Sequence, residues 1–375
     1  MRRLKVMTVF GTRPEGIKMA PIVKVMENTK EIENIVCVTA QHREMLDQVL
    51  DIFEIKPDYD LNIFKPGQTL TGITTKALEG LEKVIVETQP DLLLVQGDTT
   101  TVFAGALAAF YQKVKVGHVE AGLRSGNLYS PYPEEANRKL TGIVTNFHFA
   151  PTNESRENLL REGYPEEKIF ITGNTVIDAL FHVVKEDYIF EDSLLNNIDF
   201  KNKRVILLTS HRRENIGKPM ENIFTAIDEI TRKYEDVEVI FPVHLNPKVR
   251  NIAHKVFDGN KDIHLVEPLD YEPFTNLMSK CHIVVTDSGG LQEEAPSLGK
   301  PVLVVREETE RPEGIEAGTA KLVGTSKENI SKELDLLLSS KEEYKKMANA
   351  VNPYGDGKAS ERIVKVIIEQ MRKSM

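Results

Sequence analysis

The sequence predicts an α/β fold built from two Rossmann-like domains, and three observations carry this prediction. Short runs rich in β-branched residues alternate with helical patterns along the chain, an alternation typical of parallel sheets covered by helices on both faces. A polar, acidic stretch at residues 185–203 separates these runs into two series. Because the 375 residues also exceed a typical single core, we expect two domains.

Each expected strand is a short run of β-branched and other apolar residues. The first half of the chain contains five such runs: residues 6–10, 35–39, 92–95, 114–119 and 169–172. The second half contains six: residues 205–209, 237–241, 263–266, 283–286, 301–305 and 321–323. Near the end of the chain, apolar residues at helical spacing predict an amphipathic helix from Ser360 onward: Ile363, Val364, Ile367, Ile368 and Met371.

The composition excludes several classes of protein. A net charge of −9 argues against a nucleic-acid surface, which needs a basic face. No apolar run approaches the roughly 18 residues that cross a bilayer, and the first residues lead into a strand pattern rather than a signal peptide. We therefore expect a cytoplasmic protein without a membrane partner. Cys37 and Cys281 show no Cys-x-x-Cys spacing and are interpreted as buried, inert thiols, so no metal site is expected.

Three acidic residues of the first half indicate acid/base chemistry. Asp98 and Glu120 each follow an expected strand, and Glu134 lies in the adjoining proline-rich segment, Pro131-Tyr-Pro-Glu-Glu135. Positions of this kind line the active-site edge of a parallel sheet. Their occurrence in the same half of the chain favours a common site.

Each of these acids also has a purely structural interpretation. Asp98 could cap the helix that follows it. A buried Glu120 would need a cationic partner such as Arg124 or Arg138. Adjacent acids in a proline-rich turn, as at Glu134, are usually solvated. The residues alone leave both interpretations open.

The segment Phe10-Gly-Thr-Arg-Pro-Glu15 follows the first expected strand and predicts a helix start. Thr12 and Glu15 fit a capping box around that start. Arg13 would then project at the end of the strand, either toward an anion or as an ordinary exposed arginine.

No glycine pattern of a common nucleotide cofactor site is present. Gly11 and Gly16 do not make the Gly-x-Gly-x-x-Gly of dinucleotide-binding proteins, and the Walker-type phosphate loop is absent from the sequence. Neither nicotinamide nor Walker-type ATP chemistry is therefore expected, and no cofactor is predicted.

A second group of residues, in the other half, indicates a phosphate and sugar pocket. The expected strand at residues 283–286 ends in Asp287-Ser-Gly-Gly290 and leads into a helix, an arrangement that holds phosphates. Glu294, one turn into that helix, could accept both hydroxyls of a ribose. His211 and His244 follow two other expected strands, although each could be a loop histidine satisfied by the backbone.

These segments together resemble one protein family over nearly the whole chain. The matching segments are Phe10-Gly-Thr-Arg-Pro-Glu15 with Ile17-Lys18, Gln96-Gly-Asp98, His118-Val-Glu-Ala-Gly-Leu-Arg124, Pro133-Glu-Glu-Ala-Asn-Arg138, Thr172-Gly-Asn-Thr175, His211-Arg-Arg-Glu-Asn215 and Asp287-Ser-Gly-Gly-Leu-Gln-Glu-Glu294. They resemble the non-hydrolysing UDP-N-acetylglucosamine 2-epimerases.

The resemblance implies a glycosyltransferase-B-type fold with an interdomain active-site cleft and a homodimer. In this fold the last helix returns to the N-terminal domain. We accordingly expect an N-terminal domain of residues 1–172 joined by the C-terminal helix 360–375, and a UDP-binding domain of residues 173–359.

The resemblance also implies a reaction. UDP-GlcNAc and UDP-ManNAc would be interconverted by inversion at C2, through elimination of UDP to a 2-acetamidoglucal and re-addition, in support of surface polysaccharide synthesis. No nicotinamide is needed.

The roles that the resemblance implies fall into three sets. The catalytic set is Asp98, Glu120, Glu134 and His211. The substrate-binding set is Arg13, Lys18, Arg138, Ser288, Gly289, Gly290 and Glu294. Some members bind a second UDP-GlcNAc as an activator, and the matching positions are Gln41, Arg212 and His244. Here Glu44 stands where certain members have glutamine, which argues against activation.

Three alternatives share the fold or the ligand. A hydrolysing epimerase would release UDP and free N-acetylmannosamine, but the segment Gly11-Thr-Arg-Pro-Glu15 resembles the non-hydrolysing branch more closely. A glycosyltransferase would need an acceptor pocket, and three acids favour proton transfer instead. A non-catalytic nucleotide-sugar sensor would bind without turnover.

Overall fold

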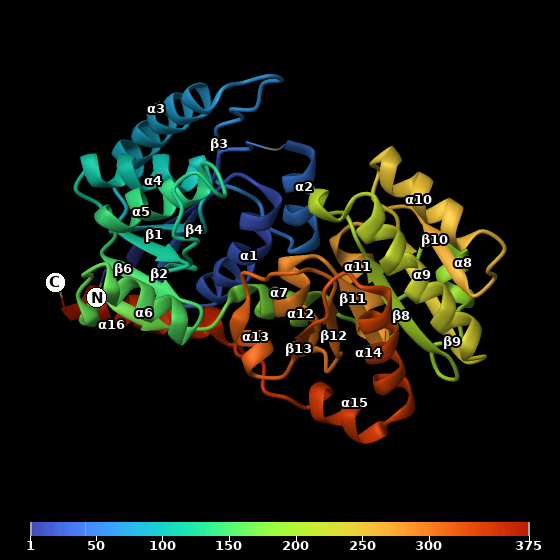
Figure 1. Cartoon of the computed structure of the whole chain (residues 1–375). Coiled ribbons are helices and arrows are strands. Elements are labelled where there is room, and N and C mark those ends of the chain that lie inside the picture. Colours follow the sequence, from blue (N-terminus) through green and yellow to red (C-terminus); the bar gives the residue numbers. More distant parts are fainter. Residues whose placement is uncertain (1, 42, 374–375) are drawn as a thin grey trace. The chain divides into compact units, whose positions relative to one another are not determined.

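The computed structural model describes residues 2–41 and 43–373 of the chain, which divides into two compact units. The first unit contains the residues up to His182 and those from Tyr354 onward, and the second is Val183–Pro353. The elements of both are labelled in Figure 1.

The first unit is built around a parallel sheet of seven strands in the order β3-β2-β1-β4-β5-β6-β7. The strands are β1 (Leu4–Phe10), β2 (Ile32–Val38), β3 (Tyr59–Asp60), β4 (Leu92–Gln96), β5 (Lys115–Val119), β6 (Phe147–Ala150) and β7 (Ile169–Ile171). The helices are α1 (Arg13–Glu27), α2 (Arg43–Ile52), α3 (Leu70–Thr88), α4 (Thr100–Tyr111), α5 (Glu134–Val144), α6 (Asn153–Arg161), the short η1 (Glu166–Lys168), α7 (Thr175–Val183), whose last residue is in the second unit, and α16 (Ala359–Lys373).

The second unit contains a parallel sheet of six strands in the order β10-β9-β8-β11-β12-β13. The strands are β8 (Arg204–Thr209), β9 (Val237–Pro242), β10 (Ile263–Val266), β11 (Ile283–Thr286), β12 (Val302–Val304) and β13 (Ala320–Leu322). The helices are α8 (Ser193–Asn197), the short η2 (Arg213–Asn215), α9 (Lys218–Lys233), α10 (Pro247–Phe257), α11 (Tyr271–Lys280), α12 (Gly289–Ser297), α13 (Pro312–Glu316), α14 (Lys327–Ser339) and α15 (Lys341–Ala348).

Burial on both faces explains why the strands are almost continuously apolar. All five residues of β4 are buried, as are the last five of β8. Strands of a parallel sheet are covered by helices on both sides, so they cannot alternate apolar with polar residues. In the first unit, side chains of β1 and β4 pack in one cluster with α3 and α4.

The C-terminal helix α16 (red in Figure 1) belongs to the first unit although it ends the chain. It packs against α1 and buries the apolar residues that predicted it: Ile363, Val364, Ile367 and Met371. Asp178 in α7 accepts hydrogen bonds from the backbone N–H groups of Ala359 (3.2 Å) and Ser360 (2.7 Å) and so fixes the start of this helix.

Both sheets have the same strand order, with the third, second, first, fourth, fifth and sixth strands of each series side by side. The second and third strands lie on one side of the first strand, and the fourth, fifth and sixth lie on its other side. The loops that leave these two central strands diverge, and ligands of α/β proteins bind at this switch point. In the first unit the switch point lies between β1 and β4, and in the second between β8 and β11.

Two further properties concern the described residues alone. Among them, no helix combines the length and apolar character needed to cross a membrane. Cys37 and Cys281 are buried, as predicted, and burial raises the pKa of each thiol to about 12, which disfavours the reactive thiolate.

Candidate active site

Glu120 lies at the carboxyl end of β5 in the first unit and is buried among polar partners. Both of its carboxylate oxygens accept hydrogen bonds from Lys18 Nζ, at 2.7 and 2.6 Å. Gln96, the last residue of β4, donates its amide N–H to Oε2, and Asn174 Nδ2 lies 3.5 Å from Oε1. Two donors besides the lysine make this an environment for an ionised carboxylate.

The prediction that Arg124 or Arg138 would pair with Glu120 is wrong. Arg124 binds Glu162 through two hydrogen bonds of 3.0 and 2.7 Å, and Arg138 turns to Asp98. Lys18 reaches Glu120 because α1 starts at the end of β1, two strands away from β5 in the sheet. The partner is therefore set by strand order and not by proximity in sequence.

The backbone at Glu120 adopts a left-handed conformation, with φ of 62°. A residue with a side chain avoids this region unless its surroundings fix it, and such residues gather at functional sites. Gly122, two residues on, has φ of 95°, and a Cβ there would lie 2.2 Å from the carbonyl oxygen of Ser155. Only glycine fits at that point, so the turn after β5 leaves little freedom for Glu120.

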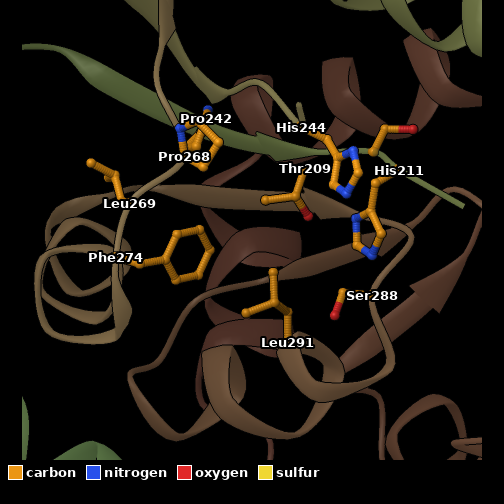
Figure 2. A pocket seen from close by; sticks show the side chains of 10 residues that line it. Thr209, His211, Pro242, His244, Pro268, Leu269, Phe274, Ser288 and Leu291 are labelled. Carbon is orange, nitrogen blue, oxygen red and sulfur yellow. The ribbon is translucent and has the colours of Figure 1, made fainter. Parts of the chain in front are cut away.

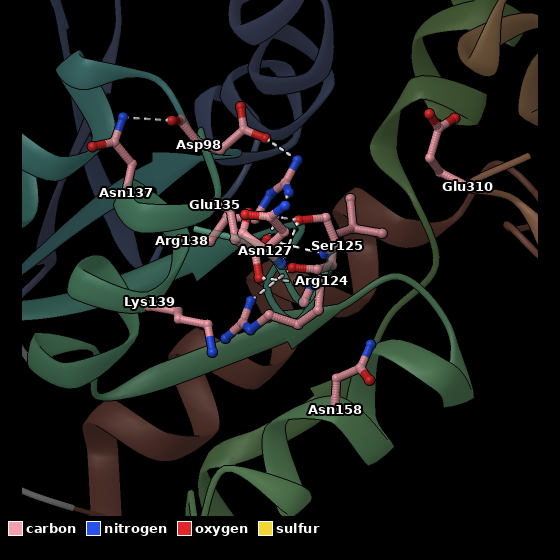
Figure 3. A network of polar contacts seen from close by, with 12 residues as sticks. Asp98, Arg124, Ser125, Asn127, Glu135, Asn137, Arg138, Lys139, Asn158 and Glu310 are labelled. Atoms are coloured by element: carbon pink, nitrogen blue, oxygen red, sulfur yellow. Dashed lines mark hydrogen bonds and ion pairs between the residues drawn. The ribbon is translucent and has the colours of Figure 1, made fainter. Parts of the chain in front are cut away.

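Asp98 follows β4 and is held from two sides by α5, as Figure 3 shows. Arg138 Nη2 donates to Asp98 Oδ2 at 2.5 Å, and the Asn137 amide donates to the Asp98 carbonyl oxygen at 2.9 Å. The alternative that Asp98 caps the next helix is wrong. Thr99 is the N-cap of α4, and its hydroxyl accepts from the Val102 N–H.

The two adjacent glutamates of α5 differ sharply in environment. Glu135 is fully buried and accepts from the backbone N–H groups of Ser125 (3.0 Å) and Gly126 (3.3 Å) and from Arg138 Nη1 (3.0 Å). Glu134 is the first residue of the helix and half-buried, and within residues 2–41 and 43–373 its carboxylate has no hydrogen-bond or ionic partner. The expectation of solvated acids thus fails for Glu135, which anchors the preceding loop.

His118 on β5 is a residue of this site that the sequence reasoning did not single out. Its Nε2 lies 2.7 Å from the Gly97 carbonyl oxygen, directly before Asp98. Burial lowers the pKa of His118 to about 4, so the ring is neutral near pH 7 and Nε2 carries the donated hydrogen. His118 begins one of the segments that carry the family resemblance, but its position within the strand, next to a turn rather than in it, did not mark it as a site residue.

The turn after β1 places Arg13 and Glu15 at the same switch point. The Glu15 carboxylate accepts from the N–H groups of Gly11 (3.0 Å) and Thr12 (2.7 Å) and from the Thr99 hydroxyl (2.6 Å). It therefore links this turn to the one after β4, and its burial raises its pKa. Arg13 begins α1 as predicted, is half-buried, and has no polar partner among the residues that the structure describes.

Of the three positions matched to activator binding, Gln41 lies in the first unit. Its side-chain oxygen accepts from the Thr101 hydroxyl at 3.0 Å, and Thr101 in turn lies 3.0 Å from the Thr39 hydroxyl. Position 11, next to these hydroxyl groups, must be a glycine, because a Cβ there would lie 1.9 Å from Thr39 Oγ1. Glu44, in the first turn of α2, is exposed.

In the second unit, Asp287 joins the loops that leave β8 and β11. Its Oδ2 accepts from the Ser210 hydroxyl (3.0 Å), from the N–H groups of His211 (2.8 Å) and Arg212 (2.9 Å), and from the Asn215 amide (3.1 Å). The side chain is completely buried. Asp287 thereby fixes the backbone from which both His211 and Arg212 project.

The helix start predicted at residues 287–290 is present. Ser288 is the N-cap of α12, so the N–H groups of Gly289 and Gly290 belong to its first turn, where no intrahelical acceptor exists. Such groups bind phosphate oxygens. A Cβ on Gly290 would lie 3.3 Å from Glu294 Oε1, so glycine leaves room for the glutamate one turn on.

A cavity of about 240 Å³ opens at the carboxyl ends of β8, β9 and β11 in this unit (Figure 2). Its lining comprises Thr209, Ser210, His211, Pro242, His244, Pro268, Leu269, Phe274, Ser288 and Leu291. The rings of His211 and His244 are stacked, with centroids 5.6 Å apart and planes inclined by 14°. An apolar lining with a few polar groups at one side suits a flat, partly polar ring. Leu269 and Phe274 gave no signal in the sequence because neither lies in a polar motif.

The predicted residues therefore fall into two groups, one at each switch point. Asp98, Glu120, Glu134, Arg13, Lys18, Arg138 and Gln41 lie in the first unit, whereas His211, Arg212, His244, Ser288, Gly289, Gly290 and Glu294 lie in the second. The first group combines three carboxylates with three cations, whereas hydrogen-bond donors predominate in the second. The described residues include no cluster of His, Cys, Asp and Glu side chains arranged to hold a metal ion.

Comparison with known proteins yields the same result by sequence and by structure. The sequence profile of a family described as UDP-N-acetylglucosamine 2-epimerase matches residues 24–368. The UDP-N-acetylglucosamine 2-epimerase of Bacillus subtilis (strain 168) is 57% identical over 368 residues, which cover 98% of this chain and 96% of that protein.

Two solved structures are similar over almost their whole length. One is the UDP-GlcNAc 2-epimerase from Neisseria meningitidis bound to UDP-GlcNAc, with a TM-score of 0.86, 53% identity and coverage of 98% of this chain and 100% of that one. The other is S. aureus MnaA with UDP, with a TM-score of 0.87, 51% identity and coverage of 98% and 97%. Together with the two sheets, they confirm the predicted fold class of two Rossmann-like domains of the glycosyltransferase-B type.

Proposed function

The chain belongs to the UDP-N-acetylglucosamine 2-epimerase family, and we propose that it inverts C2 of the sugar by eliminating UDP and adding it back. The observation that carries this mechanism is the pairing of Glu120 with Lys18 and of Asp98 with Arg138 at one switch point. A cation beside a carboxylate favours its ionised form, which can accept a proton.

Direct removal of the C2 proton by a carboxylate is implausible, because no neighbouring carbonyl acidifies it. In the proposed reaction the anomeric C–O bond breaks first, so that C1 acquires oxocarbenium character and UDP leaves with the bonding electrons. A carboxylate of the first unit then accepts the C2 proton, and a 2-acetamidoglucal remains. Protonation of C2 on the other face and return of UDP to C1 give UDP-ManNAc.

Two proton transfers on opposite faces need more than one acid/base group, and Asp98, Glu120 and Glu134 are the proposed groups. Glu120 is paired with Lys18 and Asp98 with Arg138, and these two carboxylates are proposed to accept a proton. Glu134 has no cationic partner among the described residues, which leaves it accessible to substrate.

The residues of the second unit are proposed to bind the departing UDP. Relatives with similar structures hold UDP-GlcNAc or UDP. The cavity beside Phe274 suits the uracil ring, the start of α12 suits the diphosphate, and Glu294 suits the ribose hydroxyls. Arg13 and Lys18 of the first unit and His211 of the second would stabilise the charge of the leaving group.

Proton NMR of the protein with UDP-GlcNAc in D₂O tests the proposal. Deuterium at C2 together with UDP-ManNAc is the expected result. Free N-acetylmannosamine with UDP would instead show the hydrolysing reaction. Inversion without deuterium at C2 would contradict a deprotonated intermediate, and absence of any reaction would leave a binding protein or a transferase.

We also propose that the chain forms a homodimer through the exposed apolar side chains of α4 and α5. Phe110 and Tyr111 end α4 and are 55% and 60% exposed, and Ile143 of the adjacent α5 is 73% exposed. Light scattering after size exclusion should give the mass of two chains for the wild type and of one chain for Ile143→Glu. An unchanged mass in that variant would contradict this choice of surface.

The family resemblance also raises activation by a second UDP-GlcNAc, against which Glu44 argues. Its proposed residues are Gln41, Arg212 and His244, and exposed Glu44 would oppose a nearby diphosphate. We expect hyperbolic initial rates with UDP-GlcNAc, and sigmoidal rates would show that the activator acts despite Glu44.

A further inference from the structure

The two oxygens of the Asp287 carboxylate have opposite environments. Oδ2 accepts four hydrogen bonds, whereas Oδ1 is buried and accepts none from the described residues. Four donors around one oxygen indicate an ionised carboxylate. A buried carboxylate oxygen without a donor is unfavourable, because it has lost water and gained no replacement.

One side chain lies where it could supply the missing donor. His211 Nδ1 lies 3.4 Å from Asp287 Oδ1, close enough for an ion pair if the imidazole is protonated. The ring also lines the cavity of the second unit, as Figure 2 shows. One nitrogen therefore faces the carboxylate, and Nε2, on the other side of the ring, remains for a ligand.

The surroundings of His211 within the second unit oppose its protonation. Burial lowers its pKa, and the positive charge of Arg212 and the stacked ring of His244 act in the same direction. Asp287 and Glu214 act against them. An anion bound beside the ring would add to the effect of the two carboxylates and reverse the balance.

We propose that Asp287 is a positioning residue for His211. Its Oδ1 accepts Nδ1–H of the imidazolium, which aims Nε2–H at the diphosphate of the UDP sugar, and the protein takes up one proton when this ligand binds. The proposal rests on UDP binding by the second unit. It goes further in that protonated His211 places a full positive charge beside the leaving group, and this charge forms only in the complex.

The matched variants are Asp287→Asn and, as control, Asp258→Asn. In Asp287→Asn the amide oxygen can replace Oδ2 and keep its four donors, while the NH₂ group faces His211 Nδ1 and donates to it. The imidazole of His211 is then held neutral, while the hydrogen bonds that shape the loops around residue 287 are kept. Asp258 is exposed at the end of α10, so its replacement changes the net charge equally and leaves the site alone.

Calorimetric titration with UDP-GlcNAc in buffers of different ionisation enthalpy measures the proton uptake. The diphosphate diester does not titrate near neutral pH, so any uptake belongs to the protein. The wild type and Asp258→Asn should take up close to one proton near pH 7. Their affinity should fall by up to about tenfold per pH unit as pH rises above the pKa of free His211. In Asp287→Asn both the uptake and this dependence should disappear.

The outcomes separate this proposal from the proposed function. Binding and epimerisation without proton uptake, or with the same uptake in Asp287→Asn, would overturn the role of Asp287 alone. Absence of UDP-GlcNAc binding in the wild type would overturn both.

A measurement on the wild type covers the case in which Asp287→Asn does not fold. Nitrogen-15 NMR of labelled histidines, with His211 assigned through its loss in His211→Asn, reports both ring nitrogens. A neutral ring without ligand and a doubly protonated ring with UDP-GlcNAc are expected. A ring that stays neutral in the complex would contradict the proposal.

Discussion

Lys18 Nζ lies 2.6 Å from Glu120 Oε2, although 102 positions separate the two residues in the chain. The glutamate side chain is 5% exposed and the lysine 20%. The pair joins the first turns of α1 to the end of β5, so it contributes to the fold of the first unit as well as to the proposed chemistry.

Replacement of Lys18 by methionine should destabilise the protein by about 3 kcal/mol, because Glu120 would remain buried without its cation. Urea unfolding measures this change. The control is Lys24→Met, which removes the more exposed pair with Glu27 and should cost less than about 1 kcal/mol. Equal, small losses in both variants would mean that Gln96 and Asn174 suffice to hold the Glu120 charge.

The neighbours Glu134 and Glu135 should respond in opposite ways to the same substitution. Glu134→Gln should lower kcat by about 10²- to 10⁴-fold, the usual effect of losing a general acid or base, and leave the free energy of unfolding unchanged. Asp98→Asn and Glu120→Gln should lower kcat over the same range. Near-normal turnover in any of the three would remove that residue from the mechanism.

Glu135→Gln should instead destabilise the protein, by about 1.5–3 kcal/mol, since it loses charge-assisted hydrogen bonds to Ser125 and Arg138. Arg138 would be less firmly held toward Asp98, so kcat should fall too, and Glu135→Asp should recover part of it. Unfolding by urea and initial rates on the same preparations separate the two effects. Loss of activity with full stability would indicate that Glu135 itself contacts the substrate.

Buried histidines should make the first unit sensitive to acid. Burial lowers the pKa of His148 to about 3 and that of His118 to about 4, from an ordinary value of 6.5. Below pH 6.5 the unfolded chain binds protons that the folded chain does not, so stability is lost as pH falls toward these values. Each histidine contributes up to about 1.4 kcal/mol per pH unit.

His148→Leu tests this, because neither ring nitrogen of His148 has a hydrogen-bond partner among the described residues. At pH 7 the free energy of unfolding of the variant should be at least that of the wild type. Between pH 6.5 and 4.5 it should fall less steeply with pH than in the wild type, and the difference in slope should correspond to about one bound proton. The exposed residue His254 supplies the control, His254→Leu. An unchanged slope in His148→Leu would contradict a neutral, buried ring.

Phe274→Ala should weaken UDP binding by about 1–3 kcal/mol, the usual contribution of a base stacked on an aromatic ring. The Michaelis constant for UDP-GlcNAc should rise, with kcat much less affected, because the uracil is far from the bonds that change. Ile189→Ala is the control, since Ile189 is 80% exposed in the same unit and does not line the cavity. If Phe274→Ala binds UDP with the same affinity as the wild type, the uracil ring does not bind against Phe274.

Most strands were predictable because parallel sheets bury nearly every strand residue. The expected runs at 263–266 and 283–286 coincide with β10 and β11, and the other nine differ from their strands only at the ends. β6 was missed because His148 interrupts the three apolar residues of this four-residue strand, and β3 was missed because it has only two residues.

The site was predictable where chemistry leaves a motif and hidden where packing decides. Asp98, Glu120 and the turn at Asp287 follow strands and could be found. The partnership of Lys18 with Glu120 depends on which strands are neighbours, and the roles of Glu135 and Phe274 depend on burial. Neither property is encoded locally.

The repeated strand order of the two sheets has an evolutionary consequence. Each unit offers one ready position for a ligand, but the position itself specifies no chemistry, which is supplied by the few residues that leave the two central strands. Substitutions around the cavity of the second unit could thus alter which nucleotide is accepted while the acids of the first unit stay intact. Substitutions near Asp98 and Glu120 could alter the fate of the sugar while the nucleotide stays the same. A fold divided in this way can acquire new donor specificity and new reactivity separately, one loop at a time.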